Sequence, residues 1–344
     1  MLQLKNNTPF KATITLFPNE AGIDTLYVVV KATFSIDAGA GVKIADEQSP
    51  LTMADEYWGK PGASSLKYAS DAHLCKPATD VVLVGQAWAP GRKAVPSLDV
   101  ELAVAERRKR IRVFGDRIWA DDGKQVTSPE AFETMPLIYE RAFGGVHVRD
   151  GETAEVLAEE RNPVGRGFRG AREDTEMAGL PLPNLEDPTG LVQQVGDKAV
   201  PTCFGFTAPN WQPRRGFAGT YDAAWQQKRS PYLPEDFDGR FVNAAHPDLI
   251  FERYLQGGEP VQLVHLSSEP RIGFTLPVCR LDAEVKIAGS TEGPPLNLET
   301  LLIEPDDARF SMTWRGQLQC DKKTLKVEQV TINLADLEST SGVT

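Results

Sequence analysis

Residues 26–36 read Leu26-Tyr27-Val28-Val29-Val30-Lys31-Ala32-Thr33-Phe34-Ser35-Ile36, a run rich in the β-branched and aromatic residues that favour strands. Residues 12–17 before it alternate apolar and polar side chains, which is the pattern of a second strand. Pro18-Asn19-Glu20-Ala21-Gly22 lies between the two segments and supplies the residues of a turn. The beginning of the chain therefore predicts a β-hairpin.

Strand patterns continue on both sides of the middle of the chain. Residues 80–88 form one candidate strand, which Pro90 and Gly91 end. After Pro260, six further segments have the composition of strands: residues 261–266, 272–276, 281–288, 298–304, 310–314 and 325–334. These patterns predict a mainly β fold of antiparallel sheets, arranged as a sandwich or as an open barrel.

A second hairpin is predicted over residues 98–113. Its two strands are marked by alternating apolar side chains, which are Leu98, Val100, Leu102 and Val104 in the first and Ile111 and Val113 in the second. A four-residue loop, residues 105–108, would pair Leu102 with Ile111 and place Glu101 opposite Arg112. The basic run of residues 107–110 would then lie at the tip, where its charge discourages edge-to-edge pairing. Docking of an acidic partner is the alternative use of that run.

Two short helices are predicted. Thr220 can cap the first, which runs to Lys228 with Asp222 in its first turn. Tyr221 and Trp225 are four residues apart and would share one face of it. The second covers residues 248–256, between a proline and a Gly-Gly pair, and has apolar residues at helical spacing.

Residues 132–241 lack helical and alternating patterns, yet they contain many aromatic, Arg, Gly and Pro residues. A disordered linker would lack the aromatic residues, because disorder follows from too little apolar surface to offset chain entropy. Long ordered coil is uncommon and usually functional, so we expect the working surface in this segment. We predict one β-rich domain over residues 1–338: strands in 1–131, this central coil in 132–241, and a short helix and strands in 242–338. Residues 339–344 should fray.

Composition limits the classes of protein. A chain of 344 residues, 41% of them hydrophobic, can bury a sizeable core. The formal net charge of −11 argues against a nucleic-acid binder, which normally carries a basic surface. The beginning of the chain lacks the apolar run of a signal peptide, and the most apolar segment is too short to cross a bilayer, so no membrane partner is expected. The cysteines form no Cys-x-x-Cys pair and are expected to be free thiols of a cytoplasmic protein: Cys75, Cys203, Cys279 and Cys320.

The sequence does not indicate a metal, a nucleophile or a phosphate loop. No two of the four histidines lie at helical ligand spacing, so no metal is expected. A Gly-x-Ser-x-Gly sequence, which positions the nucleophile of many hydrolases, is missing. Gly165-x-Gly167 follows no predicted strand, and the Lys and Ser/Thr of a Walker loop are not at their positions. No cofactor is therefore predicted.

Carboxylates are the only dense catalytic candidates, and they are Glu140, Glu186, Asp187, Glu235, Asp236 and Asp238. Two of them facing a sugar across a cleft would make a carbohydrate-active hydrolase. Each, however, adjoins Arg, Pro or Gly in sequence, where a carboxylate commonly braces a loop by pairing with an arginine such as Arg141, Arg166, Arg214 or Arg215. We prefer structural bracing, for which the candidates are Glu140, Arg141, Arg166, Glu186, Asp236 and Asp238, and we assign no catalytic residue.

Eight motifs in this chain resemble those of one family. Three of them are Gly219-Thr220-Tyr221-Asp222, Leu233-Pro234-Glu235-Asp236-Phe237-Asp238 and Asn243-Ala244-Ala245-His246-Pro247. The others are residues 80–90, 113–119, 136–145, 162–168 and 182–188. In this order and over nearly the whole chain, they are similar to the "domain of unknown function 2169" family of Gram-negative bacteria. Cys203 departs from the family pattern, which has Ala-Gly before Phe204.

The resemblance implies a cytoplasmic, non-enzymatic accessory protein of type VI secretion. Members of that family accompany toxic effectors with a PAAR-type spike-tip domain, stabilise them and help to load them onto the VgrG spike. The expected partner is a PAAR-domain effector, with VgrG as a second candidate. Since Trp, Tyr and Arg dominate binding hot spots, the predicted partner-binding residues are Trp211, Arg214, Arg215, Tyr221 and Trp225. The resemblance supplies no active site.

Overall fold

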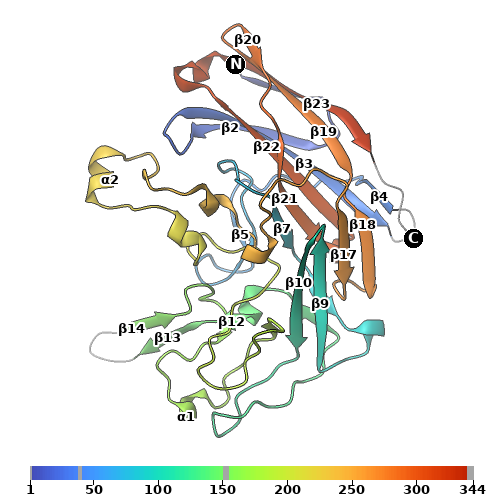
Figure 1. The fold of residues 1–344 in the computed structure, drawn as a ribbon, viewed down its shortest axis with the longest axis vertical. Coiled ribbons are helices and arrows are strands. Elements are labelled where there is room, and N and C mark those ends of the chain that lie inside the picture. Colours follow the sequence, from blue (N-terminus) through green and yellow to red (C-terminus); the bar gives the residue numbers. More distant parts are fainter. Residues whose placement is uncertain (1, 38–40, 150–154, 339–344) are drawn as a thin grey trace.

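The computed structural model describes residues 2–37, 41–149 and 155–338. These residues form mainly β-strands in open sheets, and none of the sheets that they form closes into a barrel (Figure 1). The predicted mainly β class with antiparallel sheets is confirmed. The predicted frayed tail, residues 339–344, lies outside the described residues.

The central sheet joins strands from both ends of the chain. Its order is β2 (Lys11–Pro18), β3 (Asp24–Asp37), β22 (Arg309–Gln319), β21 (Asn297–Glu304) and β7 (Asp80–Leu83), with β4 (Gly41–Ile44) also paired to β3. β7 runs parallel to β21, and the other pairs are antiparallel. The first predicted hairpin is confirmed as β2 and β3.

Strand β3 is buried on both faces. One face carries Val28, Val30 and Phe34, which belong to the main hydrophobic core. The other carries Lys31 and Thr33, which bond to buried polar groups: Lys31 Nζ lies 3.2 Å from Asp71 Oδ2, and Thr33 Oγ1 lies 3.1 Å from Ser311 Oγ. A strand covered on both faces needs no strict alternation of apolar and polar residues. This explains the continuous apolar run in the sequence.

Two further sheets enclose the same core. The four-stranded sheet has the order β1 (Gln3–Asn6), β23 (Val327–Glu338), β19 (Val278–Ile287) and β20 (Ser290–Glu292). The five-stranded sheet has the order β16 (Leu185–Glu186), β10 (Arg107–Phe114), β9 (Ser97–Val104), β17 (Pro260–Val264) and β18 (Arg271–Thr275). Phe274 of β18 stacks on Phe310 of the central sheet with the ring centroids 4.8 Å apart. The three sheets therefore share one apolar interior.

The remaining elements are short. The strands are β5 (Glu56–Tyr57), β6 (Leu66–Tyr68), β8 (Gln86–Trp88), β11 (Thr134–Pro136), β12 (Phe143–Gly144), β13 (Val146–Arg149), β14 (Glu155–Ala158) and β15 (Arg166–Gly167). The α-helices are α1 (Asp174–Met177) and α2 (Ala223–Lys228). The 3-10 helices are η1 (Pro90–Arg92), η2 (Tyr139–Arg141), η3 (Arg214–Phe217), η4 (Gly239–Val242), η5 (Pro247–Leu249), η6 (Pro305–Asp307) and η7 (Asp321–Lys326).

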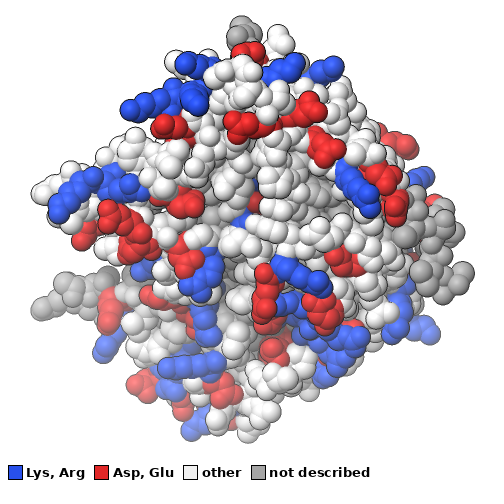
Figure 2. All heavy atoms as spheres, turned by 45° about the horizontal axis from the view of Figure 1, so that its top comes forward, with Lys and Arg blue, Asp and Glu red and all other residues white. Residues whose placement is uncertain are grey.

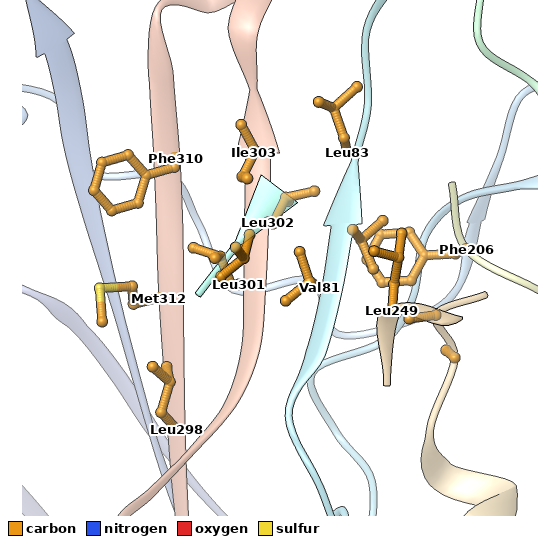
Figure 3. Packing of buried hydrophobic residues seen from close by; sticks show 14 of the residues in the cluster. Val81, Leu83, Phe206, Leu249, Leu298, Leu301, Leu302, Ile303, Phe310 and Met312 are labelled. Atoms are coloured by element: carbon orange, nitrogen blue, oxygen red, sulfur yellow. The ribbon is translucent and has the colours of Figure 1, made fainter. Parts of the chain in front are cut away.

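The central coil covers the edge of the central sheet. Phe206 of this coil and Leu249 of η5 lie beside β7, against Val81 and Leu83 (Figure 3). Much of the rest of the coil surrounds a second, smaller cluster formed by Trp119, Phe143, Met177, Leu182 and Val192. The coil is thus held by apolar packing as well as by polar contacts.

The register predicted for the second hairpin is wrong by two residues. β9 and β10 are joined by the two-residue turn Ala105-Glu106, with Ala105 at a φ of 50°. Ile111 therefore pairs with Val100, and Glu101 lies opposite Arg110 instead of Arg112. A shift of two residues returns every side chain to its predicted face, so Ile111 is buried as expected.

The basic run of residues 107–110 lies within β10 and not at the hairpin tip, so its predicted position is also wrong. Lys109 is buried, and its Nζ lies 2.8 Å from Asp248 Oδ2. Arg108 and Arg110 both contact Glu101, at 3.3 and 2.9 Å. These three residues of the basic run are therefore paired with carboxylates of the same chain.

The helix predicted over residues 248–256 does not form. In the structure η5 ends at Leu249, and isolated bridges join Ile250 to Asp80 and Leu255 to Leu298. The predicted strand over residues 80–88 is divided into β7 and β8. The first predicted helix is present as α2, but its N-cap is Asp222 and not Thr220, because Asp222 Oδ1 accepts a hydrogen bond from Trp225 N at 2.8 Å.

Candidate partner-binding surface

Residues 211–241, here called the α2 lobe, carry an exposed group of aromatic side chains. The lobe lies at the left margin of Figure 1, where α2 is well separated from the sheets. Tyr221 and Tyr232 are 53% and 41% exposed. The rings of Tyr221 and Trp225 meet edge to face with centroids 4.7 Å apart. Trp225 Nε1 also reaches the backbone carbonyl of Tyr232, and we call Tyr221, Trp225 and Tyr232 the aromatic patch.

Polar contacts fix the backbone under the aromatic patch. Trp225 Nε1 donates to Tyr232 O at 2.8 Å, which holds the end of the lobe against α2. Thr220 donates from N and Oγ1 to the two carboxylate oxygens of Asp236, at 2.9 and 2.7 Å. Arg229 donates to Glu20 O at 2.8 Å and so ties the lobe to the turn between β2 and β3. Aromatic side chains on a held backbone lose little entropy when they bind.

The other predicted partner-binding residues occupy different positions. Trp211 is 2% exposed and meets Tyr139 edge to face, so its side chain belongs to the core. Arg214 donates to Thr207 O and Phe241 O, each at 2.7 Å, and therefore braces the base of the lobe. Burial lowers the pKa of Arg214 from its ordinary value. Arg215 is exposed on η3. The structure thus brings Tyr221 and Trp225 together on the surface and leaves Trp211 beneath it.

The four carboxylates among the bracing candidates all accept hydrogen bonds from nearby groups, and they are Glu140, Glu186, Asp236 and Asp238. Glu140 accepts from Ser65 N and Ser65 Oγ, at 2.7 and 2.6 Å. Asp238 binds Arg240, and this hydrogen bond is the main cause that lowers the pKa of Asp238. Asp236 holds Thr220, whose backbone N–H lowers the pKa of Asp236.

Glu186 is the most buried of these carboxylates. It is 1% exposed and pairs with Arg117, while Val192 N donates to its second oxygen at 2.7 Å. Burial raises the pKa of Glu186, and the charge of Arg117 opposes that rise. An acid catalyst needs a raised pKa and access to substrate, but both oxygens of Glu186 are bound inside the protein. Its arginine partner was not among the four that the sequence suggested.

Arg141 and Arg166 bind a shared set of polar groups. Arg141 Nη1 donates to Asp116 Oδ1 and Asn184 Oδ1, at 3.2 and 3.1 Å. Arg166 donates to Glu140 O at 3.0 Å and to Asn184 Oδ1 at 3.3 Å. Asn184 Nδ2 in turn donates to Asp116 Oδ1, which is the main cause that lowers the pKa of Asp116. These contacts connect four separate segments of the chain.

Comparison with known families gives one match. The family described as "uncharacterized protein conserved in bacteria (DUF2169)" matches residues 21–315. The chain belongs to this DUF2169 family. Searches of curated proteins and of solved structures found no match.

The DUF2169 motifs bind one another in the structure. Asn162, from the fourth motif along the chain, donates to Tyr139 O and Phe143 O of the third, at 2.8 and 2.9 Å. The Thr220–Asp236 pair joins two others in the same way. Asp80 of the first motif, which is fully buried, accepts from Asn243 Nδ2 of the last at 2.8 Å. Contacts between these motifs therefore hold the central coil together and tie the segment that follows it to β7.

Sequence reasoning missed two groups of residues in this DUF2169 chain. The first is the buried cluster around Asp80, where Lys76 Nζ lies 2.7 Å from Asp80 Oδ2. The spacing of four residues was a signal, but it predicts a pair on a helix and no helix is present. The second is Tyr232, which completes the aromatic patch. Tyr232 lies close to Trp225 only because the backbone of the α2 lobe turns back after α2, and the sequence pattern does not show that turn.

The remaining site predictions concern cysteines, metals and membranes. All four cysteines are free, as predicted. Cys203 is buried, and burial raises its pKa to about 12. In the described ranges no three His, Cys, Asp or Glu side chains come together as a metal would require. None of the helices among the described residues is long and apolar enough to span a bilayer.

Charges of both signs are mixed on the surface. On the face shown in Figure 2, Lys and Arg lie beside Asp and Glu, with uncharged areas between them. The formal net charge of the whole chain is −11. This face differs from the continuous basic stripe of a nucleic-acid-binding protein.

Proposed function

We propose that this chain is a non-enzymatic chaperone or adaptor of type VI secretion. It binds a PAAR-domain effector in the cytoplasm, stabilises it and aids its loading onto the VgrG spike. Membership of the DUF2169 family supports the partner class through the resemblance described above. The observation that carries the binding role is the aromatic patch on the α2 lobe.

The chemistry of the aromatic patch suits protein binding. Tyr and Trp offer large contact areas together with a polar group, and they are enriched in binding hot spots. The exposed Arg215 adds a planar guanidinium on the same lobe. The carboxylates considered for sugar hydrolysis bind backbone and side-chain donors instead, which favours a structural role for them.

The test is recovery of the effector on the tagged full-length chain. The tagged chain is co-expressed with a PAAR-domain effector from the same bacterium. The double change Tyr221→Ala and Trp225→Ala should reduce recovery at least tenfold, because two aromatic contacts with the effector would be lost at about 1 kcal/mol or more each. Arg215→Ala should reduce recovery less. Leu325→Ala is the matched control, since Leu325 is 98% exposed on η7, and it should leave recovery unchanged.

Folding must be measured on the same samples. Trp211→Ala should lower the free energy of unfolding by about 3–5 kcal/mol, because it empties a large site in the core. A lower recovery of the effector by this variant would therefore not show that Trp211 contacts the effector. If the double variant has the unfolding midpoint of the wild type and still recovers the effector fully, the aromatic patch is not the binding surface. If the wild-type chain recovers no effector, the adaptor role itself is wrong.

A further inference from the structure

The outer face of the five-stranded sheet has a hollow of about 600 Å³, which we call the sheet hollow. It lies over β9, β17 and β18, which run side by side at the right of Figure 1. Register places Arg108, Ala103, Gln262 and Gly273 in one row across four strands. Two of these four residues, Ala103 and Gly273, are small, and Arg108 stands at one end of the row.

Gly273 has no structural reason to be glycine. A Cβ added to it would meet only Val261 O, at 3.9 Å, which is an ordinary contact. Its φ also lies outside the left-handed region that favours glycine. Glycine inside a strand costs stability, and it often marks a place where a ligand or another backbone comes close. The missing side chain keeps the sheet hollow open.

The charged side chains that line the sheet hollow are both arginines, Arg108 and Arg271. Arg108 shares Glu101 with Arg110, so two guanidinium groups contact one carboxylate. Among the described residues, no hydrogen-bond or ion-pair partner is found for the guanidinium of Arg271 or for the side-chain amide of Gln262. An excess of positive charge in a chain with a net charge of −11 is a local feature that selects an acidic occupant.

We propose that the sheet hollow docks an extended acidic segment of a partner protein. The segment lies across β9, β17 and β18, with small residues over Gly273 and Ala103. Its carboxylates pair with Arg271 and Arg108, and its backbone bonds to the amide of Gln262. This surface is separate from the aromatic patch, and the proposal does not depend on the effector role.

The test measures fluorescence anisotropy of a labelled ten-residue peptide of alternating Glu and Gly with the full-length chain. A peptide with Gln in place of Glu is the ligand control. The Glu peptide should bind at least tenfold more tightly than the Gln peptide at 50 mM NaCl. Its affinity should fall at 300 mM NaCl, because salt screens exposed charges. Equal binding of the two peptides, or no binding of the Glu peptide, would overturn the proposal.

Three variants locate the site. Arg271→Ala should weaken binding about tenfold, and Arg280→Ala, which removes an exposed arginine from β19 of another sheet, should leave it unchanged. Gly273→Val should weaken binding more than tenfold, since its side chain fills the sheet hollow. Valine favours strands, so the thermal midpoint of this variant should be equal to or above that of the wild type. A folded Gly273→Val variant with wild-type binding would also overturn the proposal.

Discussion

Asp80 shows how much organisation one buried side chain can provide. It is fully buried and accepts from Lys76 Nζ at 2.7 Å, from Asn243 Nδ2 at 2.8 Å and from Ala244 N at 2.8 Å. Removing one partner of a buried ion pair leaves an uncompensated charge, which is costly. Asp80 therefore fixes β7, the segment before it and the segment after η4 as one unit. Its position follows from the meeting of two segments that are distant in the sequence, residues 76–80 and 243–244, which sequence spacing does not reveal.

The buried side chain of His246 predicts that the stability of the protein depends on pH. It is buried: its Nδ1 accepts from Asp248 N at 3.2 Å and lies 3.5 Å from Asp248 Oδ2. Burial, with the nearby charge of Lys109, lowers the pKa of His246 from 6.5 to about 4, so the folded protein keeps it neutral. The unfolded chain binds a proton near pH 6.5. Stability is therefore lost as pH falls from about 7 to 4, and about 2 kcal/mol should be lost between pH 7.5 and 5.

Urea unfolding of the wild type and of His246→Asn at both pH values checks this. Asparagine keeps an acceptor for Asp248 N but does not titrate. The loss of unfolding free energy between pH 7.5 and 5 should be about 2 kcal/mol smaller in the variant. Equal losses in both proteins would show that His246 does not control this part of the pH dependence.

At the scale of elements, strands were predictable and the irregular segments were not. β2, β3, β17, β18, β19, β21, β22 and β23 overlap their predicted ranges, because β-branched and aromatic composition reports a local preference. The apolar spacing over residues 248–256 indicated which side chains are buried, but not a helix. Phe251 and Leu255 are buried, and isolated bridges to β7 and β21 hold the segment extended. Contacts with other segments decided its conformation.

The register of the second hairpin can be tested by measuring which arginine is coupled to Glu101. The observed register places Glu101 beside Arg110, with 2.9 Å between the charged atoms, and places Arg112 opposite Asp99. A double-mutant cycle of Glu101→Gln with Arg110→Gln should give a coupling energy of about 0.3–1 kcal/mol in urea unfolding. The cycle with Arg112→Gln should give a value near zero. Coupling of Glu101 to Arg112 and not to Arg110 would instead support the register predicted from the sequence, with its four-residue loop.

For the candidate partner-binding surface, too, the sequence did not show which side chains are exposed. Composition pointed to the central coil, and Tyr221 and Trp225 do lie together on its surface. Composition did not separate exposed from buried members of the same residue types, so Trp211 was grouped with them although it packs in the core. Burial depends on which segments cover a side chain, and that information belongs to the tertiary structure.

At the scale of the whole molecule, the two ends of the chain form one structure. β1 pairs with β23, β3 with β22 and β7 with β21. We expect the full chain to unfold in a single transition in urea. A fragment of residues 1–131 should show no cooperative transition by circular dichroism, because it lacks β21, β22 and β23. A fragment with its own sharp transition would show that the N-terminal strands form an independent domain.

The pairing of β3 with β22 also has a consequence during synthesis. β22 leaves the ribosome about 270 residues after β3. At a translation rate of about 5–20 residues per second, β3 waits roughly 15–55 s for that neighbour. During this time its apolar side chains and one row of backbone groups have no native cover on that side, and exposed strand edges of this kind recruit other chains. Newly made copies therefore expose this edge of β3 until β22 has been synthesised, and slower translation before β22 lengthens that exposure.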